Sequence, residues 1–152
     1  MPRALLFVLL ACLCVGCAEA PPVIDDSPQD LGEALEQGDN EAVAEMLERG
    51  ARIDTVESIS GYTPLHKAAD SGNAEAVRML LEKGAKTEAT DTLHMTPLHL
   101  ALMKKNEDAA LALIEGGADV TVATGDGLTP LQIAMASGLS RAAAAIQQRG
   151  GR

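Results

Sequence analysis

The chain has 152 residues and a formal net charge of −10 at pH 7, which leaves room for one domain of ordinary size and a tail. The charge is uneven, because Glu19 to Glu57 holds twelve acidic residues against Arg49 and Arg52, whereas Ser58 to Arg152 is nearly neutral. An acidic surface repels phosphates and anionic headgroups, so direct nucleic-acid binding is not expected. The acidic end could instead dock a basic partner or serve as a solvated cap that keeps the protein soluble.

The first residues have the layout of a secretory signal. After Arg3, residues 5–15 form an unbroken apolar run of eleven, which is too short to cross a bilayer of about 30 Å as a helix. A charged start, a short apolar stretch and then small residues are typical of a cleaved signal peptide. We therefore predict a signal peptide over residues 1–16.

Two cleavage sites are open. The string Val15-Gly16-Cys17 resembles a bacterial lipobox, in which the cysteine becomes the lipidated first residue, although Cys14 stands where an aliphatic residue is usual. The alternative is cleavage after Ala20, but the proline that follows opposes the usual signal peptidase. The lipobox is the favoured interpretation. It implies export across the inner membrane, a periplasmic or envelope-surface location, and a lipid anchor at Cys17.

A tether is predicted over residues 17–30. The stretch from Ala18 to Asp30 contains three prolines and four acidic residues and has little to bury, so it would extend up to roughly 40 Å. All three cysteines precede it or begin it. The domain that follows therefore cannot rely on disulfide bonds.

The string Thr-Pro-Leu occurs at Thr63, Thr96 and Thr129, at intervals of 33 residues. A Gly-Ala pair recurs in step at Gly50, Gly84 and Gly117. This pattern resembles the ankyrin repeat. The resemblance implies an all-α repeat fold, an ankyrin-repeat solenoid of about four helix-turn-helix units with finger turns between them. The predicted domain covers residues 31–150, with repeats over 31–57, 58–90, 91–123 and 124–150.

The second repeat shows how each unit would fold. Thr63 can cap a helix that has Pro64 in its first turn, and this helix would run to about Ser71 and turn at Gly72. A second helix would then stop at Gly84. One residue more separates Gly50 from Gly84 than separates the later pairs, so the finger around residues 58–60 is predicted to be longer by one.

Repeat three departs from its neighbours at two positions. His94 stands where repeats two and four have glycine, and Lys105 replaces a turn glycine that the other three repeats share. We expect His94 to adopt a positive φ at a cost of about 1 kcal/mol.

The two end repeats are predicted to be caps. The first lacks the Thr-Pro-Leu-His start, and its first helix, over residues 31–37, carries several polar residues. The last helix, over residues 141–149, has Gln147 where the second leucine of the pair belongs. Both outer surfaces are therefore expected to face water.

No pattern points to catalysis, to a cofactor or to a metal. The resemblance implies that His66 and His99 bond neighbouring backbone and tie repeats together. His94 is freer, but one histidine is not a site, and the domain has no cysteine to complete a zinc site. Gly125-Asp126-Gly127 lacks the remainder of a phosphate-binding loop and is interpreted as a finger turn.

The resemblance implies a protein partner, of unknown identity, on the concave face made by the finger tips and the first helices. The implied binding residues on this face are Tyr62, Asp70, Ser71, Leu93, Met95, Met103, Lys104, Asp126, Leu128 and Ser137. Several are apolar, as is common at interfaces, although each could equally be ordinary finger packing. The protein is expected to be a monomer that meets a membrane only through an N-terminal lipid.

Three roles remain open from the sequence. The first is a binding module of the bacterial cell envelope that acts as an adaptor or stabiliser. The second is an inhibitor or immunity-type protein whose acidic first repeat covers a basic toxin or enzyme. The third is a passive structural lipoprotein without a fixed partner.

Overall fold

The computed structural model describes residues 28–151, and within this range the chain forms eight α-helices and no strand. The helices come in antiparallel pairs. Their bounds are α1 Pro28–Gln37, α2 Asn40–Glu48, α3 Pro64–Ser71, α4 Ala74–Glu82, α5 Pro97–Met103, α6 Glu107–Glu115, α7 Pro130–Ser137 and α8 Ser140–Gln148. The predicted all-α repeat solenoid is confirmed. The signal peptide, Cys17 and most of the tether lie outside the described residues, and α1 begins three residues before the predicted start of the domain.

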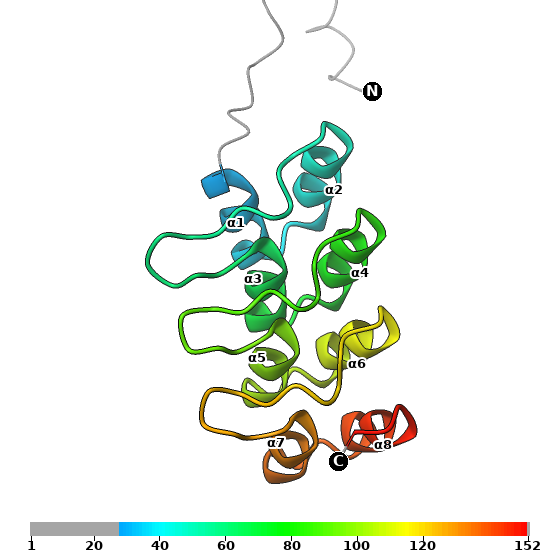
Figure 1. Cartoon of the computed structure of the whole chain (residues 1–152). Coiled ribbons are helices and arrows are strands. Elements are labelled where there is room, and N and C mark those ends of the chain that lie inside the picture. Colours follow the sequence, from blue (N-terminus) through cyan, green and yellow to red (C-terminus); the bar gives the residue numbers. More distant parts are fainter. Residues whose placement is uncertain (1–27, 152) are drawn as a thin grey trace, which may run out of the picture.

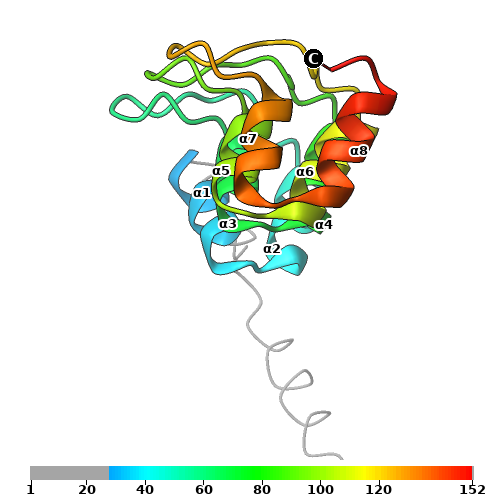
Figure 2. The same ribbon diagram turned by 90° about the horizontal axis from the view of Figure 1, so that it is seen from below.

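The four pairs stack in one direction to form two layers (Figure 1). Helices α1, α3, α5 and α7 form one layer and α2, α4, α6 and α8 form the other, and the fingers project beyond the first layer. Each helix packs against its partner and against its counterpart in the next repeat. Viewed along the stack, the fingers lie one above another on the same side (Figure 2).

The helix starts follow from local capping. The Thr63 hydroxyl accepts from the His66 N–H, and the His66 ring accepts from the Thr63 N–H, with Pro64 as the first helical residue. Such a capping box satisfies N–H groups that the helix itself leaves unpaired. Thr96 with His99 and Thr129 with Gln132 form the corresponding capping boxes at the starts of α5 and α7, which explains why Thr-Pro-Leu recurs with the repeat.

The core is a continuous strip of aliphatic side chains between the layers. Leu35, Leu65, Leu80, Leu98 and Leu113 are fully buried in it. Alanines such as Ala68 and Ala101 lie between the leucines and are also fully buried, which lets neighbouring helices approach closely. Because each repeat buries its apolar side against the next one, the stack folds only as a unit of several repeats.

The two residues at which repeat three departs from its neighbours, His94 and Lys105, both have a left-handed backbone conformation. His94 has a φ of 56° and Lys105 a φ of 62°, and they are the non-glycine residues with positive φ in the described chain. The corresponding glycines, such as Gly127 and Gly72, have φ values of 80° and 77°. Repeat three therefore carries strain that the other repeats avoid.

Candidate functional site

The fingers are held in position by side chains of their own turns. In the finger of repeat three, between α4 and α5, the carboxylate of Asp91 accepts from the N–H groups of Leu93 and Met95, at 2.8 Å each. The finger of repeat two is tied to it, because the Thr92 N–H donates to the Ser60 carbonyl at 3.2 Å. A Cβ at Gly61 would lie only 3.0 Å from the Thr92 nitrogen, so neighbouring fingers pack closely, backbone to backbone.

His66 and His99 join consecutive repeats. The ring of His66 accepts from Thr63 through Nδ1, so its Nε2–H donates to the Met95 carbonyl at 3.1 Å. In the same way Nε2–H of His99 donates to the Val122 carbonyl at 2.9 Å. Burial lowers the pKa of both imidazoles. The structural role that the resemblance implied for them is confirmed.

The concave face contains two hollows of different character. The first has a volume of about 240 Å³ and is lined by Glu36, Tyr62, Lys67, Asp70 and Ser71. The second has about 290 Å³ and lies toward the C-terminal end, where its lining is Met103, Leu128, Gln132, Ile133, Ala136 and Ser137. The first is lined mainly by charged and polar residues, whereas apolar side chains dominate the second.

An ion pair lies between the two hollows. Lys104 Nζ is 3.0 Å from Oδ1 of Asp70, an oxygen that is itself shielded from water. The close contact with the Asp70 carboxylate raises the pKa of Lys104. The pair links α3 to Lys104, the residue that follows the last turn of α5.

The structure brings together most of the predicted binding residues. Tyr62, Asp70 and Ser71 share the first hollow, and Met103, Leu128 and Ser137 share the second. Leu93 and Asp126 are exposed on the fingers, and Met95 is half-buried. These three finger residues line neither hollow.

Lys67 is a residue of this face that sequence reasoning missed. Its Nζ lies 2.6 Å from a carboxylate oxygen of Glu36 and 2.6 Å from one of Glu57, and its side chain is only 15% exposed. Burial alone would lower the pKa of Lys67, but the two carboxylates outweigh it and raise the pKa. Repeats three and four have Leu100 and Ile133 at this position, and that change of residue type was the available signal.

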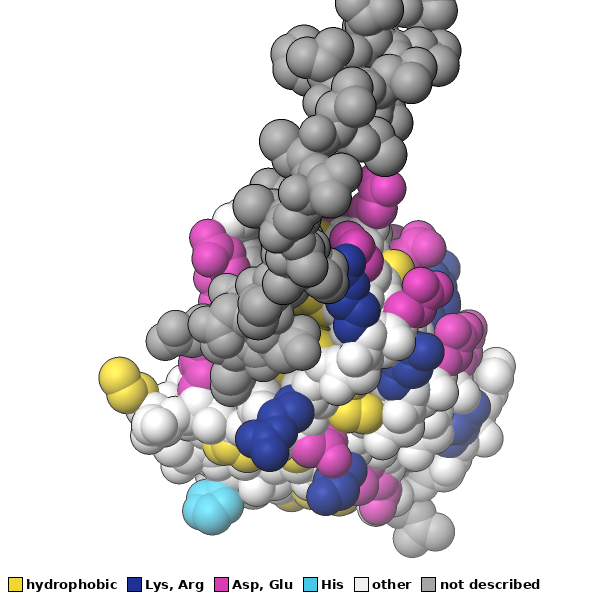
Figure 3. Space-filling view, turned by 90° about the horizontal axis from the view of Figure 1, so that it is seen from above, with side chains coloured by type: hydrophobic (Ala, Val, Ile, Leu, Met, Phe, Trp, Pro, Cys, Tyr) yellow, Lys and Arg dark blue, Asp and Glu magenta, His cyan; other side chains and the backbone are white. Residues whose placement is uncertain are grey.

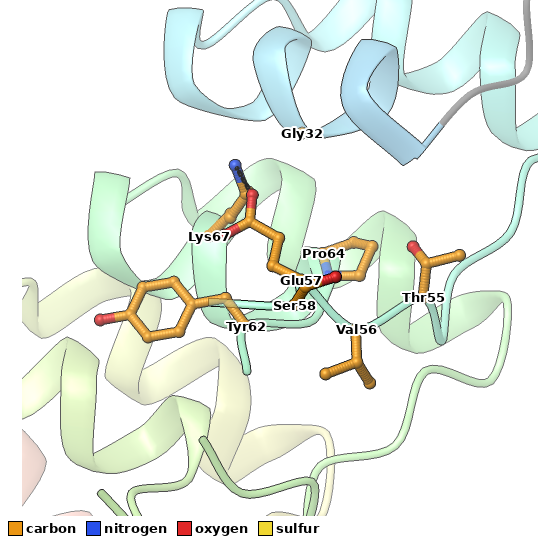
Figure 4. Close-up of a pocket in the computed structure, with 8 residues that line it drawn as sticks. All are labelled: Gly32, Thr55, Val56, Glu57, Ser58, Tyr62, Pro64 and Lys67. Carbon is orange, nitrogen blue, oxygen red and sulfur yellow. Dashed lines mark ion pairs between the residues drawn. The ribbon is translucent and has the colours of Figure 1, made fainter. Parts of the chain in front are cut away.

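Lys67 also lines a pocket of about 230 Å³ between the first repeat and the finger of repeat two, which joins α2 to α3 (Figure 4). Gly32 faces this pocket where repeats two and three carry His66 and His99. A Cβ at Gly32 would come 3.1 Å from Lys67 Nζ. The ammonium group therefore occupies space that a larger residue would need.

Within residues 28–151 no group of three His, Cys, Asp or Glu side chains could hold a metal ion. None of the helices in that range is long and apolar enough to cross a membrane. The exposed features of the concave face are apolar and charged side chains, which suit binding.

Stacked helix pairs with projecting fingers define the class of helical repeat proteins. A family model described as "Ankyrin repeats (3 copies)" matches residues 31–124, which is more than half of the chain. The protein belongs to the ankyrin-repeat family. A search of curated proteins finds no match for the chain. Ankyrin repeats are generally protein–protein interaction modules and typically are not enzymes.

Proposed function

We propose that the protein is a non-enzymatic binding module that holds a protein partner on its concave face. The observation that carries this proposal is the second hollow, where Met103 is 53% and Leu128 is 47% exposed. Exposed apolar side chains gathered in a hollow and flanked by the Asp70–Lys104 pair have the composition of an interface, with an apolar centre and a charged rim.

We further propose that the module acts in the bacterial cell envelope, exported and lipid-anchored at Cys17. The support is the sequence of residues 1–17 alone. Growth of producing cells with labelled palmitate would test it, because the Cys17→Ser chain would lose the label under this proposal. Retention of the label by that variant, or cleavage after Ala20 in the purified protein, would contradict it.

Affinity capture from an envelope extract tests the binding proposal. Every buried residue of the core lies between Leu31 and Ile146, so a chain of residues 18–152 keeps the whole fold and can be immobilised. A partner held by this chain should be lost when Met103 and Leu128 are both replaced by glutamate. The matched control adds the same charge at Ala123 and Ala144, which are exposed but line neither hollow.

Salt dependence separates this role from inhibition of a basic toxin or enzyme by the acidic first repeat. Binding dominated by the acidic repeat should weaken steeply between low and physiological ionic strength. Binding in the apolar hollow should change little. If no protein distinguishes the concave-face variant from its matched control, a passive structural role becomes the better account.

A further inference from the structure

The two ends of the stack are not finished in the same way. Helix α8 is polar on its outer side, where Gln147 replaces Leu81 and Ile114 of the preceding repeats. Helix α7 is not. Met135 is 65% exposed, whereas Ala69 and Leu102, at the same place in α3 and α5, are fully buried. Helix α5 packs on α3 and α7 packs on α5, whereas no further helix pair follows α7 and α8 in the described chain. Met135 therefore lies where a following repeat would pack.

The opposite end carries the matching half of such a contact. A groove of about 320 Å³ opens there between α1 and α2 and is lined by Glu33, Ala34, Gln37, Asp39, Ala42 and Met46. Ala42 and Met46 are half-buried there, whereas their counterparts in repeat two, Ala76 and Leu80, are fully buried. Ala34 is only 7% exposed. Inside the stack the preceding repeat fills this groove, and at the N-terminal end of the described chain the groove is open.

The charges of the two ends are complementary. From Gly127 to Gly151 the chain has no acidic residue, and it carries Arg141 and Arg149. The groove at the other end is lined in part by Glu33 and Asp39. Figure 3, which looks onto this end, shows acidic side chains on it, with Lys and Arg side chains among them. An approach of this end to a second acidic end would be repulsive, whereas an approach to the C-terminal end is attractive.

The register of the stack assigns partners across such a contact. Arg141 Nη1 lies 3.2 Å from Oδ1 of Asp108, and these are the second residues of α8 and α6. Glu41 is the second residue of α2. Continuing the stack by one repeat would therefore place Glu41 of another copy next to Arg141, just as Asp108 is placed on its other side.

We propose that the C-terminal end of one copy binds the N-terminal end of a second copy, with Met135 in the groove of Ala34, Ala42 and Met46 and Arg141 beside Glu41. This head-to-tail contact uses two different surfaces, so it does not close and extends into short chains. The polar Gln147 makes it weaker than a contact inside the stack. Association is reversible, and the monomer expected from the sequence is the dilute form.

Sedimentation equilibrium of residues 18–152 over a range of concentrations up to about 1 mM tests the proposal. The average mass should rise with concentration, and Met135→Glu should keep it at the monomer value. Arg141→Glu and Glu41→Arg should each weaken association by about tenfold, because each replaces attraction by repulsion. An equal mixture of these two variants should associate again, since each then meets its complement.

Circular dichroism and thermal unfolding establish that all variants are folded, which the exposure of the three residues favours. A wild-type chain that stays monomeric throughout the range overturns the proposal. Loss of association in Met135→Glu together with full association in Glu41→Arg also overturns it, because that pattern belongs to a two-fold contact between C-terminal ends.

Discussion

His66 and His99 each cap a helix and donate to the next finger. Burial lowers the pKa of both, so they also make stability depend on pH. Repeat four provides an internal comparison, since Gln132 takes the place of His66 and His99 and still accepts from the Thr129 N–H at 3.0 Å. A glutamine therefore serves the cap. It lacks the imidazole N–H that reaches from His66 to the Met95 carbonyl in the following finger.

We predict that acid destabilises the protein through these two histidines. Burial lowers their pKa in the folded state, whereas the unfolded value is about 6.5. The unfolded chain therefore binds more protons below about pH 6.5, so stability is fully present above that pH and is lost as the pH falls through the lowered folded pKa. Urea unfolding at a series of pH values from about 7.5 to 5 measures this loss.

The double variant His66→Gln, His99→Gln should flatten that part of the pH dependence. It should also cost about 1 kcal/mol for each hydrogen bond to the next finger at neutral pH. The pKa of Glu57 is lowered chiefly by its hydrogen bond to Lys67, with a further one from Ser60. Glu57 therefore affects the stability only in a more acidic range. A variant with the wild-type slope above pH 5 would show that other groups carry the effect.

We predict that glycine at His94 or at Lys105 stabilises the protein by about 0.5–1 kcal/mol each, because glycine relieves the left-handed strain but is more flexible when unfolded. Thermal unfolding measures the change. Gly127→Ala is the reverse control and should destabilise by a similar amount, since its Cβ would meet no atom within 4 Å and only backbone strain is added. A destabilised His94→Gly would mean that the imidazole makes contacts that outweigh the strain.

At the scale of the elements, helix α8 is capped from another repeat. Its own N-cap residue, Leu139, has no side-chain acceptor. Oε1 of Glu107, one repeat earlier, accepts instead from the N–H groups of Arg141 at 2.9 Å and Ala142 at 3.2 Å. The last helix therefore depends on the repeat before it for its start.

We predict that Glu107→Ala lowers the stability of the last repeat by about 1 kcal/mol, the usual value of a helix cap. Glu107→Gln should keep much of it, because the amide oxygen still accepts. Hydrogen exchange of the α8 amides is the measurement. Equal losses in both variants would assign the effect to the charge of Glu107. We do not expect this outcome, because the exposed contact of Arg141 with Glu107 at 3.8 Å is weak.

At the scale of the whole molecule, the stack is a linear array in which each repeat contacts only its neighbours. Leu35 in α1 and Leu102 in α5 are both fully buried, but Leu102 has folded repeats on both sides. A cavity in the end repeat should therefore destabilise fewer repeats than an equivalent cavity in the middle of the stack.

We predict that Leu102→Ala costs 2–5 kcal/mol and lowers hydrogen-exchange protection throughout the stack. Leu35→Ala should instead open α1 and α2 first and leave α5 to α8 largely protected. Exchange followed helix by helix distinguishes the two. Uniform loss in both variants would mean that the four repeats unfold as one indivisible unit.

The sequence by itself determined the architecture, because the elements of a repeat are specified locally. Thr63 and Pro64 start a helix and Gly72 ends it without help from distant residues. The recurrence at 33 residues predicts the stack through its resemblance to the ankyrin repeat. The positive φ of His94 could be predicted for the same reason. So could the two backbone-bonding histidines, once the resemblance was seen.

Only the tertiary structure decided which side chains share a surface. The burial of Lys67 between Glu36 and Glu57, and the division of the concave face into a polar and an apolar hollow, depend on the distances between helices. The same holds for Met135, whose position reads as core in the repeat pattern and is exposed because the described chain places no repeat beyond α7 and α8. Periodicity identifies the positions of a repeat, but exposure depends on which neighbours are present.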